Sequence, residues 1–279
     1  MPARSLLFTP ATRLDRLARA MAAGPDWVAL DLEDGVGPGD KASAREALSV
    51  FARDELRPRA DRVAVRINAL STAEGIRDMA AMLDWPIWPG MLILPKVSAP
   101  SEVAQVLALA ADCGQAPVIM AVLETAEGIA NAEPIARALP GSGVLAYGSA
   151  DHMAETGGEM SAPSLAWARG RIVNAAALAG IPAIDGVWLD YRDAEGLTAE
   201  AQLAKSMGFA GKIAIHPDQI APINSVFSPT GAEVESARAL LAASEAAGGG
   251  AFSHNGKMVD APVLARARRI VETCNRSKT

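Results

Sequence analysis

The sequence of 279 residues predicts a closed α/β barrel, a (β/α)8 TIM barrel, followed by a C-terminal helical tail or lid. Three observations lead to this prediction. Short apolar runs alternate eight times with longer, alanine-rich segments of helical spacing. Most of the runs are apolar throughout, as expected of parallel strands covered on both faces. The length is close to the roughly 250 residues that are typical of such barrels.

The eight runs predict strands over the following ranges: Ser5–Phe8, Trp27–Leu32, Arg62–Ile67, Met91–Leu94, Val118–Leu123, Val144–Tyr147, Gly186–Leu189 and Lys212–Ile215. The longer segments between them predict helices, which include Thr12–Ala23, Lys41–Leu56, Ser101–Cys113, Ser164–Ala179 and Ala194–Met207. Asp40, Ser101 and the Pro163-Ser164 pair precede or open three of these segments, and such residues favour helix starts. Each predicted strand is therefore followed by a segment long enough to return the chain to the next strand.

An open, doubly wound sheet is the alternative arrangement of repeated βα units. No Gly-x-Gly-x-x-Gly motif opens a helix after the first run, and the count of eight units favours closure. The best candidate break is Gly248–Gly250, so we predict a barrel with its closing helices over 1–247 and a lid segment over 248–279. Spacing alone leaves open whether this tail packs on its own barrel.

Charge and cysteine content limit the function classes. The formal net charge of −6 argues against a nucleic-acid-binding surface, although a local arginine can still hold a small anion. Two distant cysteines indicate a reducing compartment, and three scattered histidines are too few for a zinc site. No secretory h-region and no run of eighteen apolar residues occur, which predicts a cytoplasmic protein.

Ionisable residues follow the predicted strands on nearly every unit. The carboxyl ends of barrel strands meet at one rim, where barrel enzymes carry their chemistry. The residues expected there are Arg13, Asp31, Glu33, Asp34, Arg66, Lys96, Glu124, Asp151, Asp190 and His216. So many charges on one rim predict a site, although helix capping alone explains some of these carboxylates.

Glu124 and Asp151 lie one βα unit apart, so they are expected on neighbouring strand ends. Two adjacent carboxylates repel one another unless a cation or a proton separates them. Mg²⁺ prefers oxygen ligands and often uses one or two carboxylates together with substrate oxygens. The alternative is that Glu124 pairs with a lysine or arginine and that Asp151 caps the following helix.

Arg66 and Lys96 each allow two interpretations. Arg66 follows a buried run, and its planar guanidinium suits a carboxylate, either of a substrate or of Glu33, Asp34 or Glu124. Lys96 follows Pro95 and either forms a Schiff base or pairs with Glu33. The ion pair is favoured because a carboxylate pair is available in the same site.

Several motifs together identify a family. The chain resembles the citrate lyase β-subunit-like family of acyl-CoA lyases, which includes malyl-CoA and citramalyl-CoA lyases. The resemblance covers nearly the whole chain and rests on these segments: Arg4-Ser5-Leu6-Leu7-Phe8-Thr9-Pro10, Leu30-Asp31-Leu32-Glu33-Asp34-Gly35-Val36, Val65-Arg66-Ile67-Asn68, Leu94-Pro95-Lys96, Glu124-Thr125-Ala126-Glu127-Gly128, Gly148-Ser149-Ala150-Asp151, Lys212-Ile213-Ala214-Ile215-His216-Pro217 and Gly256-Lys257-Met258-Val259-Asp260. After the first strand, Thr9-Pro10-Ala11-Thr12-Arg13 stands where many relatives have Val-Pro-Gly-Asn-Arg.

The resemblance implies a role for each site residue. It implies that Glu124 and Asp151 hold Mg²⁺ and that Arg66 binds the substrate carboxylate. Glu33 and Asp34 would orient metal-bound water or Lys96. Arg4 and Arg13 would flank the strand end that receives CoA. Asp260 would belong to a lid that completes the site of a neighbouring subunit in a homotrimer or hexamer. The same Asp260 would protonate the product enolate.

The implied reaction is reversible cleavage of a β-hydroxyacyl-CoA thioester to acetyl-CoA and a 2-keto acid. Citramalyl-CoA, which gives pyruvate, is favoured over malyl-CoA, which gives glyoxylate. Two enzymatic alternatives are a citrate lyase β subunit acting on a citryl thioester of an acyl-carrier protein and a Mg²⁺-dependent aldolase acting on free hydroxy-keto acids. A non-enzymatic alternative is an oligomeric acyl-CoA-binding protein.

Overall fold

The computed structural model describes residues 4–246, 250–254 and 256–276, which form two compact units that divide between Asn224 and Ser225. The predicted division, between 247 and 248, lies further along the chain. The reason for the difference is helix α11 (Gly231–Ala246), which packs against α12 (Ala261–Arg276) within the second unit. Because the structure does not place the two units relative to one another, each is described by itself.

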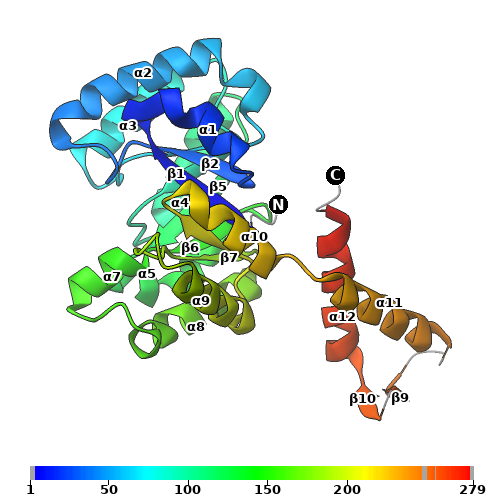
Figure 1. The fold of residues 1–279 in the computed structure, drawn as a ribbon. Coiled ribbons are helices and arrows are strands. Elements are labelled where there is room, and N and C mark those ends of the chain that lie inside the picture. Colours follow the sequence, from blue (N-terminus) through cyan, green and yellow to red (C-terminus); the bar gives the residue numbers. More distant parts are fainter. Residues whose placement is uncertain (1–3, 247–249, 255, 277–279) are drawn as a thin grey trace. The chain divides into compact units, whose positions relative to one another are not determined.

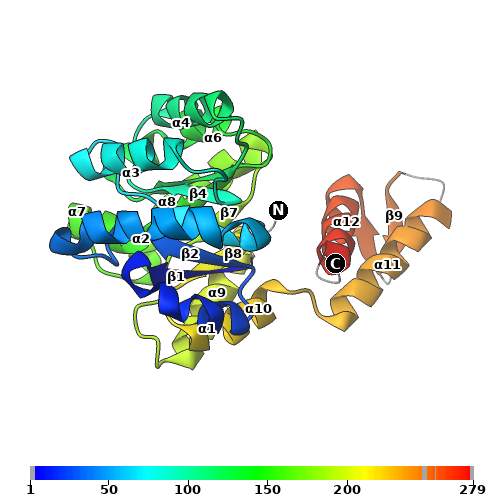
Figure 2. The same ribbon diagram turned by 90° about the horizontal axis from the view of Figure 1, so that it is seen from above.

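The first unit is a closed barrel of eight parallel strands in chain order, with helices around the outside (Figures 1 and 2). The last strand pairs with the first, where Leu6 lies opposite Ile213, and this pairing closes the barrel. The predicted fold is therefore confirmed. The strands are β1 (Ser5–Pro10), β2 (Trp27–Asp31), β3 (Val63–Arg66), β4 (Met91–Leu94), β5 (Val118–Leu123), β6 (Val144–Tyr147), β7 (Ala183–Asp185) and β8 (Gly211–Ala214).

The prediction of the seventh strand is wrong. The predicted run, Gly186–Leu189, follows β7 and forms part of the loop beyond it. The actual strand ends in Asp185, a carboxylate that is fully buried, so charge interrupts the apolar pattern where the strand lies. The other seven predicted strands match the observed ones to within two residues at each end.

Helices connect the strands around the barrel. In α3 and α5, Thr72 and Thr125 cap the first turn by accepting a hydrogen bond from the backbone N–H three residues later. The helices of the first unit are α1 (Leu17–Ala22), α2 (Lys41–Asp54), α3 (Ala73–Leu83), α4 (Pro100–Asp112), α5 (Ala126–Ala130), α6 (Ala132–Ala138), α7 (Ser149–Thr156), α8 (Ala162–Ala179) and α9 (Ala194–Met207), with α10 (Ile220–Phe227) running across the division. Short 3-10 segments are η1 (Ala11–Arg16), η2 (Pro38–Asp40), η3 (Arg57–Arg59) and η4 (Pro217–Gln219).

Apolar side chains from alternate strand positions fill the barrel interior. Because side chains along a strand alternate between its two faces, the inward positions of each strand are two residues apart. The buried interior cluster consists of Leu6, Trp27, Ala29, Ala64, Met91, Ile93, Met120, Val122, Val144, Ala146, Ile184 and Ile213. This alternation determines which residues come next at the carboxyl end of each strand.

A group of four charges is buried on the outside of the barrel, between β7, β8 and helices α8 and α9. Asp185 binds Arg169 through paired hydrogen bonds of 2.9 Å and binds Lys212 Nζ at 2.7 Å. Glu200 lies 2.7 Å from both Arg169 and Lys212. We call these residues the buried quartet; its two cations and two carboxylates balance.

The second unit consists of α11, the hairpin of β9 (Phe252–His254) and β10 (Lys257–Val259), and α12. Of the predicted break at 248–250, positions 248 and 249 lie outside the described residues, and Gly250 has a positive φ of 93°. In the described parts of the chain, no helix is long and apolar enough to cross a membrane. Cys113 and Cys274 are both free thiols.

Candidate active site

A cavity of about 370 Å³ opens at the carboxyl ends of the barrel strands. Its polar lining includes Asp31, Arg66, Glu124 and Asp151. The first three continue the inward-facing rows of β2, β3 and β5, because each lies two residues beyond an interior residue of the same strand. The site is therefore the next layer of the barrel interior, built from charges in place of aliphatic side chains. We call Asp31, Glu33, Arg66, Lys96, Glu124 and Asp151 the rim cluster.

Arg66 forms its strongest contact with Asp31, its direct neighbour in the register of β2 and β3. Nε and one terminal nitrogen donate to the two Asp31 oxygens at 2.7 Å, and the other terminal nitrogen lies 2.9 Å from Glu33 Oε2. The guanidinium also lies over the Phe8 ring, 4.4 Å from its centre. The hydrogen bonds to Asp31 use two of the five guanidinium N–H groups, and the terminal nitrogen beside Glu33 carries N–H groups available to a ligand in the cavity.

Lys96 connects three strand ends. Its backbone N–H donates to Glu124 Oε1 at 2.8 Å, while its Nζ lies 2.5 Å from Glu33 Oε1 and 3.4 Å from Asp151 Oδ1. Its φ of 52° is left-handed, a conformation that costs a non-glycine residue about 1 kcal/mol. Burial opposes protonation, but the hydrogen bond and charge of Glu33 raise the pKa of Lys96. A protonated amine is a poor nucleophile, so the geometry fits the predicted ion pair rather than a Schiff base.

Glu124 is the most perturbed carboxylate of the rim cluster. It is 2% exposed, and burial together with Glu33 and Asp151 raises its pKa to about 8. Its Oε1 accepts the Lys96 N–H, whereas Oε2 accepts no hydrogen bond from the described parts of the chain. A Cβ on Gly148 would lie 2.2 Å from this Oε2. The glycine therefore leaves the space that the carboxylate occupies.

Asp151 and Asp34 are the more exposed acids of this site. Asp151 lies in the first turn of α7 and keeps 36% of its side chain exposed. Asp34 is 59% exposed and lies 4.0 Å from both Arg66 and Lys96, at the limit of an ion pair. Glu33 is buried, and burial raises its pKa above the ordinary value despite its ion pairs with both cations.

The fit of a divalent cation follows from this charge balance. The rim cluster contains four carboxylates and two cations, and the buried Glu124 is destabilised as an anion. Glu124 and Asp151 both line the cavity and offer the hard oxygen ligands that Mg²⁺ prefers. Among the described residues no group of three acidic, histidine or cysteine side chains converges. A cation held here would therefore complete its coordination with water or ligand oxygens.

The other predicted binding residues lie apart from the rim cluster. Arg4 precedes β1, at the amino end of the barrel, and pairs with Asp26 at 2.7 Å, so the geometry gives no support to a role in the cavity. Arg13 follows β1 at the carboxyl end and pairs with Asp15 at 2.8 Å. Asp260 lies in the second unit, where it precedes α12 and its Oδ1 accepts the Val263 N–H at 3.4 Å.

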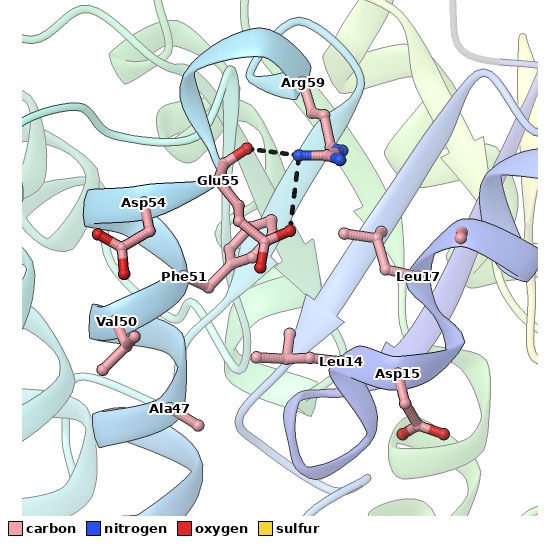
Figure 3. Close-up of a pocket in the computed structure, with 10 residues that line it drawn as sticks. Leu14, Asp15, Leu17, Ala47, Val50, Phe51, Asp54, Glu55 and Arg59 are labelled. Carbon is pink, nitrogen blue, oxygen red and sulfur yellow. Dashed lines mark hydrogen bonds and ion pairs between the residues drawn. The ribbon is translucent and has the colours of Figure 1, made fainter.

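A second cavity, of about 340 Å³, lies between α1, α2 and η3 on the outside of the barrel (Figure 3). Phe51, Leu14 and Leu17 form its apolar part, and Arg59 bonds to Glu55 at its edge. Asp15, Asp54 and Glu55 also line it, and these acids disfavour an anionic ligand such as a nucleotide. The cavity includes no residue of the rim cluster.

Three residues important to the site geometry received no role from the sequence, although Asp31 was among the charges expected at the rim. Asp31 binds Arg66, Phe8 covers the guanidinium, and Gly148 makes room for Glu124. A signal for the first two was present, because each lies two positions beyond an interior residue of its own strand. For Gly148 the sequence held no signal, since the contact depends on the approach of a neighbouring strand.

A barrel with buried carboxylates and cations around a cavity at the carboxyl ends of its strands is the arrangement of a barrel enzyme. The chain belongs to the HpcH/HpaI aldolase/citrate lyase family, whose model matches residues 4–217. A second model, described as a C-C bond lyase of the TIM-barrel fold, matches residues 170–276. These matches confirm the predicted family and make the protein a carbon–carbon lyase.

Individual relatives match over almost the full length. The chain is 36% identical to a citrate lyase subunit beta-like protein of Deinococcus radiodurans, over 96% of each chain. It is 35% identical to an L-malyl-CoA/beta-methylmalyl-CoA lyase of Cereibacter sphaeroides, over 97% of this chain and 94% of the relative. The solved structure of CitE from Mycobacterium tuberculosis in complex with magnesium, acetoacetate and coenzyme A matches with a TM-score of 0.81 at 37% identity, over 98% of both chains.

Proposed function

We propose that the protein is a Mg²⁺-dependent lyase that reversibly cleaves a β-hydroxyacyl-CoA thioester of the citramalyl-CoA or malyl-CoA type. The products would be acetyl-CoA and pyruvate or glyoxylate. The main observation is Glu124, a buried carboxylate with a pKa near 8 beside Asp151, because a divalent cation would relieve this repulsion. Two relatives support the substrate class: the L-malyl-CoA/beta-methylmalyl-CoA lyase of Cereibacter sphaeroides and the CitE structure with magnesium and coenzyme A.

Each residue of the rim cluster has a distinct task in this proposal. Glu124 and Asp151 would hold Mg²⁺, which supplies Lewis acidity toward the hydroxyl and carboxylate oxygens of the departing keto-acid part. Arg66 would bind that carboxylate through N–H groups that Asp31 does not use, while Asp31 and Glu33 hold its guanidinium in place. Lys96 keeps Glu33 and Asp151 from repelling one another.

The apolar part of the cavity suits the thioester and its acetyl group. Phe8, Val122, Val187 and Ile213 line it and exclude water from the reacting carbon. The hydroxyl proton passes to solvent water and the C–C bond breaks, with its electron pair remaining on the thioester part, which gives a keto acid and a thioester enolate. The enolate carbon then takes a proton to form acetyl-CoA, and we propose Asp260 as the donor.

Asp260 would reach the cavity from another copy of the chain. We propose a homotrimer or hexamer in which the second unit of one copy completes the site of its neighbour. Mixing Glu124→Ala with Asp260→Asn tests this, because subunit exchange would restore activity in sites that combine an intact barrel with an intact Asp260. No recovery, in mixtures shown by light scattering to contain mixed oligomers, contradicts the proposal.

A panel of substrates tests the reaction itself. Citramalyl-CoA, malyl-CoA, citryl-CoA and free hydroxy-keto acids are each incubated with Mg²⁺ or with EDTA, and keto-acid release is measured. We expect turnover of a CoA thioester that EDTA abolishes and Mg²⁺ restores. Turnover of free acids alone favours the aldolase alternative, and a requirement for an acyl-carrier protein favours the citrate lyase subunit.

Two variants tie that activity to the rim cluster. Glu124→Ala should remove it, while Glu127→Ala, an exposed glutamate three residues further on, should leave it unchanged. Undiminished, EDTA-insensitive activity of Glu124→Ala would refute the proposal.

A further inference from the structure

Lys41 donates its three ammonium protons to three neutral oxygens. Its Nζ lies 2.7 Å from Leu32 O, 2.6 Å from Glu33 O and 2.7 Å from Asn68 Oδ1. It forms no ion pair with any carboxylate of residues 4–246, 250–254 and 256–276. A lysine ammonium has three N–H donors, so these contacts satisfy it completely.

The position of Lys41 is unfavourable for the helix that carries it. Lys41 is the first residue of α2, where the helix dipole presents its positive end and favours acidic side chains. The two carbonyl groups that it binds belong to the loop after β2, beyond the last strand residue. The lysine therefore serves the loop after β2 rather than its own helix.

The third acceptor of Lys41 is itself fixed in place. Asp78, which is 1% exposed, accepts hydrogen bonds from the Asn68 backbone at 2.8 Å and from its side-chain amide at 2.7 Å. The other Asp78 oxygen accepts from Arg45 Nε at 2.6 Å. Arg45 lies four residues after Lys41, on the same face of α2. These bonds join α2, α3 and the loop after β3 into one support.

This support ends at the backbone of Glu33. The Glu33 N–H donates to Asp31 Oδ1 at 2.9 Å and its carbonyl accepts from Lys41, so the peptide groups on both sides of the residue are held. The Glu33 carboxylate in turn contacts both cations of the rim cluster, Lys96 at 2.5 Å and Arg66 at 2.9 Å. A displacement of the Glu33 backbone would therefore disturb a carboxylate that both cations contact.

We propose that Lys41 is a positioning residue that sets the geometry of the rim cluster through the backbone of Glu33. Lys41 is absent from the lining of the cavity, so it acts without touching the substrate. Its kinetic consequence rests on the proposed lyase function, whereas its effect on the loop does not. A compact ammonium is needed, because a planar guanidinium cannot direct its donors at three converging oxygens.

The test compares Lys41→Met with Arg53→Met, which removes one charge from an exposed position of the same helix. We expect Lys41→Met to lower kcat about 10²-fold, because a small misplacement in a reactive site has effects of this size. KM for the thioester should change less than about threefold. Hydrogen exchange of the loop 32–36 should become at least about tenfold faster in Lys41→Met. Arg53→Met should match the wild type in all three measurements.

Two further results decide the proposal. A folded Lys41→Met protein with wild-type kcat and wild-type exchange in 32–36 overturns it. Should Lys41→Met not fold, Lys41→Arg decides: kcat reduced at least about fivefold with faster exchange supports the proposal, and wild-type values of both overturn it. If the wild type cleaves no thioester, the proposed function fails, while the exchange measurement still tests the role of Lys41.

Discussion

The buried quartet and the rim cluster use the same residue types at opposite sides of the barrel wall, with opposite results. Asp185 and Glu124 are both almost completely buried, at 0% and 2% exposure. Burial raises the pKa of either carboxyl, but Lys212 and Arg169 lower the pKa of Asp185 below its ordinary value. In Glu124 burial and the neighbouring acids prevail, and its pKa rises to about 8.

Charge balance accounts for the difference. The quartet matches two carboxylates with two cations, all packed between the outer face of the strands and two helices. The rim cluster has an excess of carboxylates, lies on the inward face and borders a cavity. In a buried cluster that is already neutral, each charge needs the partners it has, whereas uncompensated charge next to a cavity favours binding of a ligand.

The largest expected effect tests the rim side of this comparison. Glu124→Gln keeps the shape of the side chain but removes its charge, so the site loses the buried carboxylate that we propose as a cation ligand. We expect kcat/KM to fall about 10⁴-fold, an increase in barrier of about 5.5 kcal/mol, in steady-state assays with saturating Mg²⁺. A loss smaller than about tenfold would mean that the carboxylate is structural, as in the quartet.

The next effect tests the quartet. Asp185→Asn leaves Arg169 and Lys212 with a single carboxylate, Glu200, in a region sealed from solvent. We expect the free energy of unfolding from urea titrations to fall by about 3 to 5 kcal/mol. Asp40→Asn, at an exposed position whose side chain caps no backbone group, is the matched control and should change it by less than about 0.5 kcal/mol. A cost below about 1 kcal/mol for Asp185→Asn would contradict the assigned role.

The smallest effect is a difference in pH dependence. The folded pKa of Glu124, about 8, lies above its ordinary value of 4.5, so its contribution to stability is greatest below pH 4.5 and is lost as the pH rises through 8. Without metal, Glu124→Gln should therefore gain stability relative to the wild type by about 1.4 kcal/mol per pH unit between pH 5.5 and 7.5.

Asp185 provides the opposite case. Its pKa is lowered, so its contribution is fully present above pH 3.8 and is lost only as the pH falls through the folded pKa. The stability difference between Asp185→Asn and the wild type should stay constant from pH 5.5 to 7.5 in the same urea titrations. A parallel pH dependence of the two variants would show that the charge environments of Glu124 and Asp185 do not differ as described.

The sequence allowed the fold to be predicted because apolar runs mark seven of the strands, although β2 and β3 end in a charged residue and β8 contains Lys212. The seventh failed because Asp185 carries a charge on the outward face of β7, where the apolar pattern should continue. The division between the units also differs from the prediction, since α11 buries Val234 and Ala237 within the second unit. Apolar periodicity identifies a helix but does not show which neighbour covers it.

The candidate site was only partly accessible from the sequence. Charges at strand ends predicted Glu33, Lys96, Glu124 and Asp151, and the structure brings them together. Glu33, one of the partners considered for Arg66, does lie 2.9 Å from it, whereas Asp31, which lies opposite Arg66 in the register of neighbouring strands, was not considered. The role of Lys41 could not be predicted, because its three acceptor oxygens come together only in the folded chain and leave no pattern in a single sequence.

Gly148 has a consequence for attempts to redesign this barrel. The volume that its side chain would fill is occupied by Glu124, a residue of the neighbouring strand. Loop grafting that replaces the turn before α7 is a natural way to alter what the cavity accepts. Such a graft must carry glycine at position 148, because even the Cβ atom of alanine would displace the Glu124 side chain, which the graft does not replace. A redesign must therefore exchange the two strand ends together or retain them together.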